Sequence, residues 1–184
     1  MIEAALLCLV VAISDGDTIK VRCADRPQMV VRLAEIDAPE KAQPFGQRSK
    51  ALLSTLCFRK QAEIRPARLD RYGRTVARVT CASTDASAAM VRAGMAWAYT
   101  RYLTDPQIRA MEIVARREGT GLWADDHPVP PWEWRKTGAK GMRSNAVARR
   151  PLRTRAAPMS REPSRRGTIC RLFERPALRQ LGSC

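Results

Sequence analysis

Three runs near the start of the chain have the apolar patterns of β-strands. Residues 6–13 are apolar and end in β-branched side chains, residues 18–23 alternate apolar with charged side chains, and residues 29–33 contain a single charge. Alternation with a period of two is typical of a strand that buries one face. Asp15-Gly16 lies between the first two runs and predicts a two-residue hairpin turn.

The middle of the chain continues with a helix and two more strands. In residues 46–57 three leucines fall on one helical stripe. Residues 61–66 and 75–80 have the apolar and β-branched composition of strands, and Tyr72-Gly73 between them predicts a turn. We therefore expect one helix and a second hairpin in this segment.

Capping signals mark two further helices. Asp85 is placed to cap a helix over 85–93 that Gly94 ends. Pro106 takes the first helical position of a helix over 105–118. Five short strands and three helices predict an α+β fold, rich in β-structure, in which the helices pack against a small closed β-barrel.

Composition limits the class of protein and its partners. The chain has 184 residues and is 45% hydrophobic, so it suits one domain and is too apolar to be wholly disordered. No apolar run approaches the roughly 18 residues of a membrane-spanning helix. The net charge of +15 and the pI near 10.6 favour polyanionic partners, with nucleic acid first.

Most of the net positive charge follows Lys136. Residues 137–184 carry a net charge of +10 and are rich in Arg, Pro, Ser and Ala, whereas residues 1–136 carry +5. The lack of periodicity predicts a folded domain over 1–136 and a basic, largely disordered tail over 137–184. A solvated extension is the simplest interpretation of this tail. A basic arm that adds salt-dependent affinity for phosphates is the alternative.

Three acids and two arginines stand out by their positions. Asp17 follows the first predicted turn, and Arg32 interrupts an otherwise apolar strand. Asp37 and Glu40 occupy the loop after that strand, and Arg74 ends the second hairpin turn. Carboxylates and guanidiniums in turns and at strand ends are candidates for a shared site.

These residue types suit the cleavage of a phosphodiester. Carboxylate oxygens of Asp17 and Asp37, with a backbone carbonyl and water, are the hard ligands that Ca²⁺ prefers. Glu40 could orient or deprotonate an attacking water, and two guanidiniums can hold phosphate oxygens. Asp in turns and Arg on strand faces are also common without any such role, so residue types alone leave a structural interpretation open.

An ordered set of short motifs resembles the staphylococcal nuclease (thermonuclease) family over roughly residues 6–136. The motifs are DGDT (15–18), VRLAEIDAPE (31–40), FGQRSK (45–50), DRYGR (70–74), GLW (121–123) and PPWEWR (130–135). Their common order and spacing are far more specific than any one motif. The resemblance implies a five-stranded OB-fold barrel with about three packed helices.

The resemblance also implies an activity and a site. Members of this family are Ca²⁺-dependent endonucleases that act on DNA and RNA and leave 3′-phosphates. The matching residues are Asp17, Asp37 and the Ala38 carbonyl for one Ca²⁺, Glu40 as the proposed general base, and Arg32 and Arg74 for the scissile phosphate.

Aromatic residues add candidates for contact with the substrate. Tyr99 and Tyr102 lie near the region where the family places pocket tyrosines, and Tyr72 lies within the DRYGR motif. All three are therefore candidate substrate-binding residues. The four tryptophans are expected in core or clamp contacts rather than on bases.

Two other functions compete with a nuclease. The first is a non-catalytic nucleic-acid-binding OB-fold module, as in the nuclease-like domains of Tudor staphylococcal nuclease proteins, which lack catalytic residues. The second is a structural barrel whose Arg-rich tail alone binds polyanions. The chain keeps all five charged site residues, which favours an enzyme, and we expect it to be a monomer.

Six cysteines leave the redox state of the chain open. In the predicted two-residue hairpin, Cys8 and Cys23 would face each other, which predicts a disulfide unless a bulge shifts the register. Cys57 and Cys81 end predicted elements and could form a second pair that spacing does not fix. The two cysteines of the tail are expected to be unpaired. Buried free thiols are the alternative to disulfides.

Disulfides would place the protein outside the cytoplasm, secreted or in the periplasm. Residues 4–13 are apolar enough for a short signal segment, but Glu3 precedes them and no basic region does. The same residues are needed for the first strand, so we expect a longer natural leader to be missing from this start. A cytoplasmic location stays open as the alternative.

Overall fold

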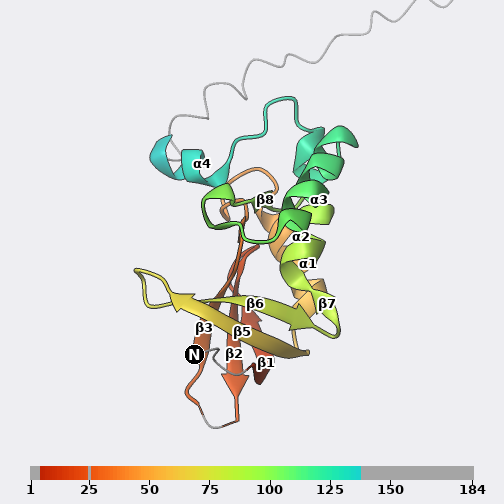
Figure 1. The fold of residues 1–184 in the computed structure, drawn as a ribbon. Helices are drawn as coiled ribbons and strands as arrows, with labels where there is room; N and C mark the ends of the chain where they lie inside the picture. Colours follow the sequence, from red (N-terminus) through yellow and green to blue (C-terminus); the bar gives the residue numbers. More distant parts are fainter. Residues whose placement is uncertain (1–4, 25, 138–184) are drawn as a thin grey trace, which may run out of the picture. The chain divides into compact units, whose positions relative to one another are not determined.

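A closed five-stranded barrel organises residues 5–24 and 26–137, which are the residues described by the computed structural model (Figure 1). β1 (Leu6–Ile13), β2 (Thr18–Cys23) and β3 (Met29–Leu33) form an antiparallel meander, and β5 (Gln61–Leu69) and β6 (Thr75–Cys81) form a second hairpin. β1 also pairs with β5, and β3 pairs with β6 in parallel, which closes the barrel. The expected five-stranded OB-fold barrel of an α+β fold is confirmed.

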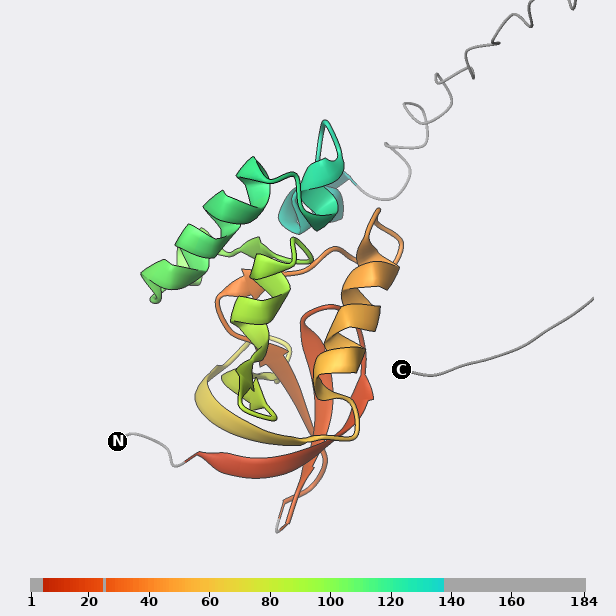
Figure 2. The ribbon, with the colours of Figure 1, turned by 90° about the vertical axis from the view of Figure 1, so that its right-hand side faces the viewer.

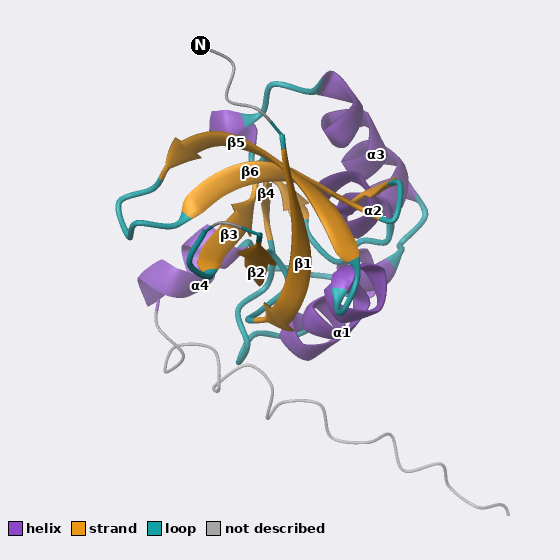
Figure 3. Ribbon diagram, turned by 90° about the horizontal axis from the view of Figure 1, so that it is seen from below, coloured by secondary structure: helices purple, strands orange, loops and turns teal. Residues whose placement is uncertain are grey.

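The three expected helices lie on one side of this barrel. They are α1 (Gly46–Cys57), α2 (Ala86–Arg92) and α3 (Pro106–Arg117), and α1 and α2 run side by side (Figure 2 and Figure 3). The Asp85 side chain caps α2 by accepting a hydrogen bond of 2.8 Å from the Ala88 N–H. A fourth helix, α4 (Pro131–Thr137), follows near the end of the described chain and was not expected.

Several short elements complete the fold. β4 (Ile36–Asp37) pairs with β8 (Trp97–Ala98), and β7 (Thr84–Asp85) extends the sheet beside β6. The 3-10 helices are η1 (Thr100–Tyr102) and η2 (Gly121–Ala124). The β4–β8 pair matters for the site because it fixes Asp37, which the sequence indicated only as a loop residue.

The apolar faces of the strands form the main core inside the barrel. Val10, Ile19 and Val31 from the barrel are fully buried, as are Leu53 of α1 and Met90 of α2. The alternation of apolar and polar positions therefore corresponds to the inner and outer faces of the barrel. A smaller cluster centres on buried Trp97 and Trp123, in line with the core contacts expected of the tryptophans.

The first hairpin reaches its expected register by two deviations that compensate. Ile13 faces Ile19, and the Ser14 N–H donates to the Thr18 carbonyl at 2.8 Å, so the turn has three residues, 15–17, and the expected two-residue turn is wrong. A bulge beyond Val10 then shifts the register back by one residue. Cys8 consequently faces Cys23, as the two-residue turn had predicted.

Two disulfides cross-link the fold. Cys8 is bonded to Cys23, and Cys57 at the end of α1 is bonded to Cys81 at the end of β6. The alternative of buried free thiols is therefore wrong for these four residues. The first bridge ties two barrel strands together, and the second ties the barrel to a helix.

The described residues all belong to one of the two units into which the chain divides, Met1–Ala148. The expected basic tail lies outside the described residues, apart from Thr137 at the end of α4, and so does the expectation for its two cysteines. Within residues 5–24 and 26–137, no helix combines the length and hydropathy needed to cross a membrane.

Candidate active site

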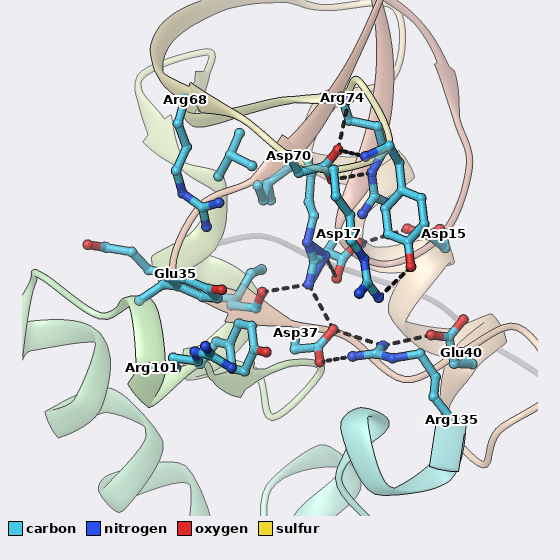
Figure 4. Close-up of a pocket in the computed structure, with 18 residues that line it drawn as sticks. Asp15, Asp17, Glu35, Asp37, Glu40, Arg68, Asp70, Arg74, Arg101 and Arg135 are labelled. Atoms are coloured by element: carbon cyan, nitrogen blue, oxygen red, sulfur yellow. Dashed lines mark hydrogen bonds and ion pairs between the residues drawn. The ribbon is translucent and has the colours of Figure 1, made fainter.

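A charged cavity of about 540 Å³ opens where β2, β3 and β6 meet β4 and α4 (Pro131–Thr137) (Figure 4). It brings together the candidate residues Asp17, Arg32, Asp37, Glu40, Tyr72, Arg74, Tyr99 and Tyr102. Ala38 is the exception, since it is buried and does not line the cavity. Its backbone N–H instead donates to Asp17 Oδ2 at 3.1 Å.

The closing seam of the barrel positions the two candidate phosphate-binding arginines. β3 and β6 run parallel there, with Val31 opposite Thr75 and Arg32 opposite Val76. Arg74 directly precedes β6. Both guanidiniums therefore reach the cavity from this seam, although the two residues are 42 positions apart in the sequence.

Arg32 holds the two candidate metal-ligating carboxylates. Its Nη1 donates to Asp17 Oδ2 at 2.6 Å, and its Nη2 donates to Asp37 Oδ1 at 2.8 Å. The side chain of Asp37 is only 1% exposed, and that of Arg32 is 15% exposed. Burial acts to lower the pKa of Arg32, but the charges of Asp17 and Asp37 outweigh it and the net shift is upward. Arg32 is therefore a fixed cation at the base of the cavity.

Two carboxylates at this end of the cavity, Asp15 and Asp37, have raised pKa values, and burial is the main cause for both. Burial raises the pKa of Asp37, and the charge of Asp17 adds to this rise, although hydrogen bonds and charges from arginines oppose it. Burial and the neighbouring Asp17 carboxylate also raise the pKa of Asp15 to about 6. Burial and a neighbouring carboxylate both disfavour the ionised form of such a group, and a positive charge nearby favours it.

This donor set fits a hard divalent cation. Within the described ranges, no three His, Cys, Asp or Glu side chains are already arranged as a metal-binding group. The reason is that Asp17 and Asp37 are turned towards arginines. The available donors are nevertheless all oxygens. Those of Asp17 and Asp37 belong to two buried carboxylates that repel each other. Ca²⁺ and similar hard cations prefer such oxygen ligands.

Arg135 is a site residue that the sequence did not single out. Its Nη2 donates to Asp37 Oδ2 at 2.7 Å, and its Nη1 donates to Glu40 Oε1 at 2.8 Å. Burial acts to lower the pKa of Arg135, but these hydrogen bonds and charges raise it well above its usual value. Arg135 belongs to the PPWEWR motif, so the motif was the only signal that could have indicated it.

Aromatic contacts place α4, and with it Arg135, beside the cavity. The Trp132 ring stacks on Tyr99, with centroids 5.6 Å apart and an interplanar angle of 16°. Trp132 also meets Trp97 edge to face at 5.6 Å. Val129 lies on the loop that precedes α4, and its carbonyl accepts a hydrogen bond of 2.6 Å from Gln43 Nε2. Tyr99 therefore supports the helix as well as lining the cavity.

Asp70 orients Arg74 and was also missed. Arg74 Nε donates to Asp70 Oδ2 at 2.7 Å, and the N–H groups of Tyr72 and Arg74 both donate to Asp70 Oδ1 at 2.9 Å. Burial acts to raise the pKa of Asp70, but the hydrogen bonds from Arg74 and Tyr72 outweigh it and lower the pKa below its usual value. An Asp two residues before a turn residue is the known signal for such a turn.

The remaining tyrosines lie at different parts of the cavity. Tyr72 is 66% exposed and lies beside Arg71 and Arg74, whose guanidinium carbons are 4.7 and 5.4 Å from its ring centroid. Tyr102 meets Tyr99 edge to face at 5.1 Å. All three candidate tyrosines thus border the charged groups, but only Tyr72 and Tyr102 are largely open to solvent.

The chain matches known nucleases in sequence. Residues 30–125 match the family described as Staphylococcal nuclease homologue, a range that contains Arg32, Asp37, Glu40 and Arg74. A Haemophilus influenzae protein named Uncharacterized endonuclease is 46% identical over 129 residues, which cover 70% of this chain and 72% of the relative. The Micrococcal nuclease of Shigella flexneri is 44% identical over 138 residues, covering 69% and 79%. A rice protein named Probable staphylococcal-like nuclease CAN1 is 37% identical over 111 residues, covering 60% and 34%.

Proposed function

Because the chain belongs to the staphylococcal nuclease family and is thus a nuclease, we propose that it is a Ca²⁺-dependent endonuclease that cleaves DNA and RNA and leaves 3′-phosphates. One observation carries this proposal. A single cavity holds two anchored guanidiniums, Arg32 and Arg74, together with the carboxylates of Asp17, Asp37 and Glu40. A phosphodiester bound by the arginines would lie beside all three acids.

Arg32 and Arg74 bind the oxygens of the scissile phosphate. Each guanidinium is already held by a carboxylate, Arg32 by Asp17 and Asp37, and Arg74 by Asp70. Donors fixed in advance stabilise the charge that builds up in the transition state without reorganising during the reaction. By comparison with removal of one oxyanion donor, each arginine is worth about 3–4 kcal/mol of transition-state stabilisation.

Glu40 acts as the general base. Its carboxylate is 40% exposed, so water can reach it, and Arg135 holds it at 2.8 Å. Glu40 takes a proton from water as the water oxygen bonds to phosphorus. The bond between phosphorus and the 5′ oxygen breaks, and the 5′ oxygen leaves as a hydroxyl after taking up a proton. The phosphate then remains on the 3′ oxygen.

Asp17, Asp37 and the Ala38 carbonyl would hold one Ca²⁺. When bound, this ion would supply positive charge to the site and would offset the burial and the Asp17 charge that raise the pKa of Asp37. Asp15, with a pKa of about 6, adds negative charge to the same end of the cavity.

The disulfides support a location outside the cytoplasm. Cys8–Cys23 and Cys57–Cys81 are both bonded, and such bonds persist mainly in oxidising compartments. We propose that the protein is secreted or periplasmic. Fractionation of the natural host with an antibody against residues 1–136 would test this, and a wholly cytoplasmic signal would contradict it.

Cleavage of labelled DNA and RNA tests the proposed activity. The wild-type protein should cleave both with Ca²⁺, stop when a chelator is added, and leave 3′-phosphate ends. Glu40→Gln and Arg74→Ala should each lose at least about 100-fold in rate. Arg117→Ala, which alters an exposed arginine of α3 outside the cavity, should keep full activity. Undiminished cleavage by either site variant, or 5′-phosphate products, would contradict the proposal.

A further inference from the structure

A second cavity of about 550 Å³ adjoins the active site. It lies along β5, the start of β6 and the segment 101–104, and it has no part in the proposed chemistry. The two cavities share Arg68, Arg101 and Tyr102 among their lining residues. Each has a volume within the range of about 300–1,000 Å³ that is usual for ligand sites. A ligand longer than one cavity could therefore extend into the next.

The second cavity is strongly basic. Its lining contains Arg65, Arg68, Arg78 and Arg101, and Glu35 is its only acid. Glu35 is buried and accepts hydrogen bonds from Arg78 Nη2 at 2.9 Å and from the Thr104 N–H at 2.9 Å, and the Thr104 hydroxyl also donates to it. Its negative charge is thus already neutralised within the protein and offers little repulsion to an anion.

Arg68 and Arg101 both lie against the ring of Tyr102, which lines both cavities. The guanidinium carbons of Arg68 and Arg101 lie 4.3 and 5.6 Å from the centroid of Tyr102. Both side chains are exposed, and neither forms an ion pair with a carboxylate of the described residues. Figure 4 shows Arg68, Glu35 and Arg101 at one end of the active-site cavity and Glu40 and Arg135 at the other.

We propose that Arg68 and Arg101 form a subsite that binds a phosphate of a nucleotide flanking the cleaved bond. The subsite rests on the proposed nuclease function, since it extends the same substrate path. Guanidiniums without a carboxylate partner bind phosphate oxygens through charge-assisted hydrogen bonds, and stacking on Tyr102 holds them in place beforehand. Only a strand that continues beyond the active site can fill this subsite, so it selects for longer substrates.

A length series separates this subsite from the catalytic cavity. The Arg68→Ala/Arg101→Ala double variant is compared with the wild type on a single-stranded DNA dinucleotide and on a 12-nucleotide strand. On the longer strand we expect KM to rise at least about tenfold with kcat unchanged, because only binding of the flank is lost. On the dinucleotide, kcat/KM should stay within about twofold of the wild-type value.

Binding measured without cleavage gives a second readout. With a chelator present, fluorescence anisotropy of the labelled 12-nucleotide strand is followed across a range of salt concentrations. Loss of the one phosphate that both arginines hold should reduce the magnitude of the slope of log K against log salt by about 0.7, the contribution of one neutralised phosphate on a single strand. Arg22→Ala/Arg117→Ala removes the same charge outside both cavities and should retain the slope.

Each outcome assigns a role. An equal loss on the dinucleotide and the longer strand would place Arg68 and Arg101 at the scissile phosphate and overturn the subsite. An equal change in slope in Arg22→Ala/Arg117→Ala would show that the slope depends only on the net charge of the protein, and it would also overturn the subsite. If the wild type cleaved neither strand, the nuclease proposal would fail, while the anisotropy measurement would still decide whether the arginines bind the strand.

Discussion

Arg135 Nη2 lies 2.7 Å from Asp37 Oδ2, although 98 positions separate the two residues in the sequence. The contact joins the last described helix to a carboxylate on the short strand β4. Asp37 is only 1% exposed and is shared between Arg32 and Arg135. The end of the described chain therefore lines the charged cavity and is not a separate addition to the barrel.

Arg135→Ala should lower both stability and activity. Asp37 keeps Arg32, and Arg135 itself is 43% exposed, so we expect a loss of about 1–2 kcal/mol instead of the roughly 3–5 kcal/mol for breaking a fully buried pair. Cleavage should fall by about 10- to 100-fold because Glu40 loses its orienting partner. Urea unfolding and steady-state kinetics measure the two effects.

Two variants control for the loss of Arg135. Lys136 is the next residue of α4 and is exposed. Lys136→Ala should change the free energy of unfolding by no more than about 0.5 kcal/mol and the cleavage rate by no more than about twofold. Arg135→Lys should restore only part of the rate, since an ammonium cannot bridge two carboxylates with the same fixed geometry. Full activity in Arg135→Ala would show that Glu40 needs no support from α4.

Asp70→Ala should reduce catalysis without touching the substrate directly. Asp70 accepts hydrogen bonds from Arg74 Nε and from two backbone N–H groups of the turn. Its removal frees the Arg74 guanidinium, and a displacement of about 1 Å can cost on the order of 100-fold in rate. Asp70→Asn keeps the acceptor oxygen and should lose less. Equal rates for the wild type and Asp70→Ala would show that the turn alone orients Arg74.

Asp15 should make stability depend on pH. Burial and the Asp17 charge raise the pKa of Asp15 to about 6 in the folded protein, above its value of 3.8 when unperturbed. The folded state therefore binds the Asp15 proton more tightly than the unfolded state does. This contribution is present below about pH 4 and is lost as pH rises towards 6, by about 1.4 kcal/mol for each unit of pKa shift.

Asp15→Asn isolates that contribution because the amide oxygen can still accept the Asp17 N–H. Relative to the wild type, the free energy of unfolding of the variant should increase steadily from pH 4 to pH 6 and then level off. Urea unfolding of both proteins at four pH values measures this difference. A difference that is flat across the range would place the pKa of Asp15 at its ordinary value.

Reduction of the disulfides should destabilise the barrel. The Cys8–Cys23 bridge spans 15 positions and the Cys57–Cys81 bridge spans 24, so each contributes about 3 kcal/mol by chain entropy. Thermal unfolding with and without a reductant should show a large drop in Tm. Thiol titration of the denatured Cys170→Ser/Cys184→Ser variant should give no free thiol before reduction and four after it. Four thiols before reduction would rule out both bridges.

Local patterns were sufficient for most of the fold because the relevant forces act between near neighbours. Apolar and β-branched runs, one of them alternating, identified the five barrel strands, and capping by Asp85 identified the start of α2. The pairing of Cys8 with Cys23 was also correct, but the turn assumed for it was wrong. An extra turn residue and a bulge have opposite effects on register, and no local preference reveals that both occur.

The parts that escaped prediction depend on contacts between distant segments. Arg135 and its helix have no apolar periodicity of their own, and α4 is held by the contacts of Trp132 with Tyr99 and Trp97. Arg68 and Arg101 meet only because β5 and η1 place them on the same tyrosine. Side chains that gain their roles from tertiary packing leave no signature in the neighbouring sequence.

The parallel pairing of β3 with β6 has a consequence for when the enzyme becomes active. Arg32 and Arg74 lie on opposite sides of this closing seam, so they come together only when the barrel is complete. A chain still emerging from the ribosome carries both arginines without a site between them. Nucleic acid that contacts the chain during its synthesis therefore meets an unfolded chain without an assembled nuclease site.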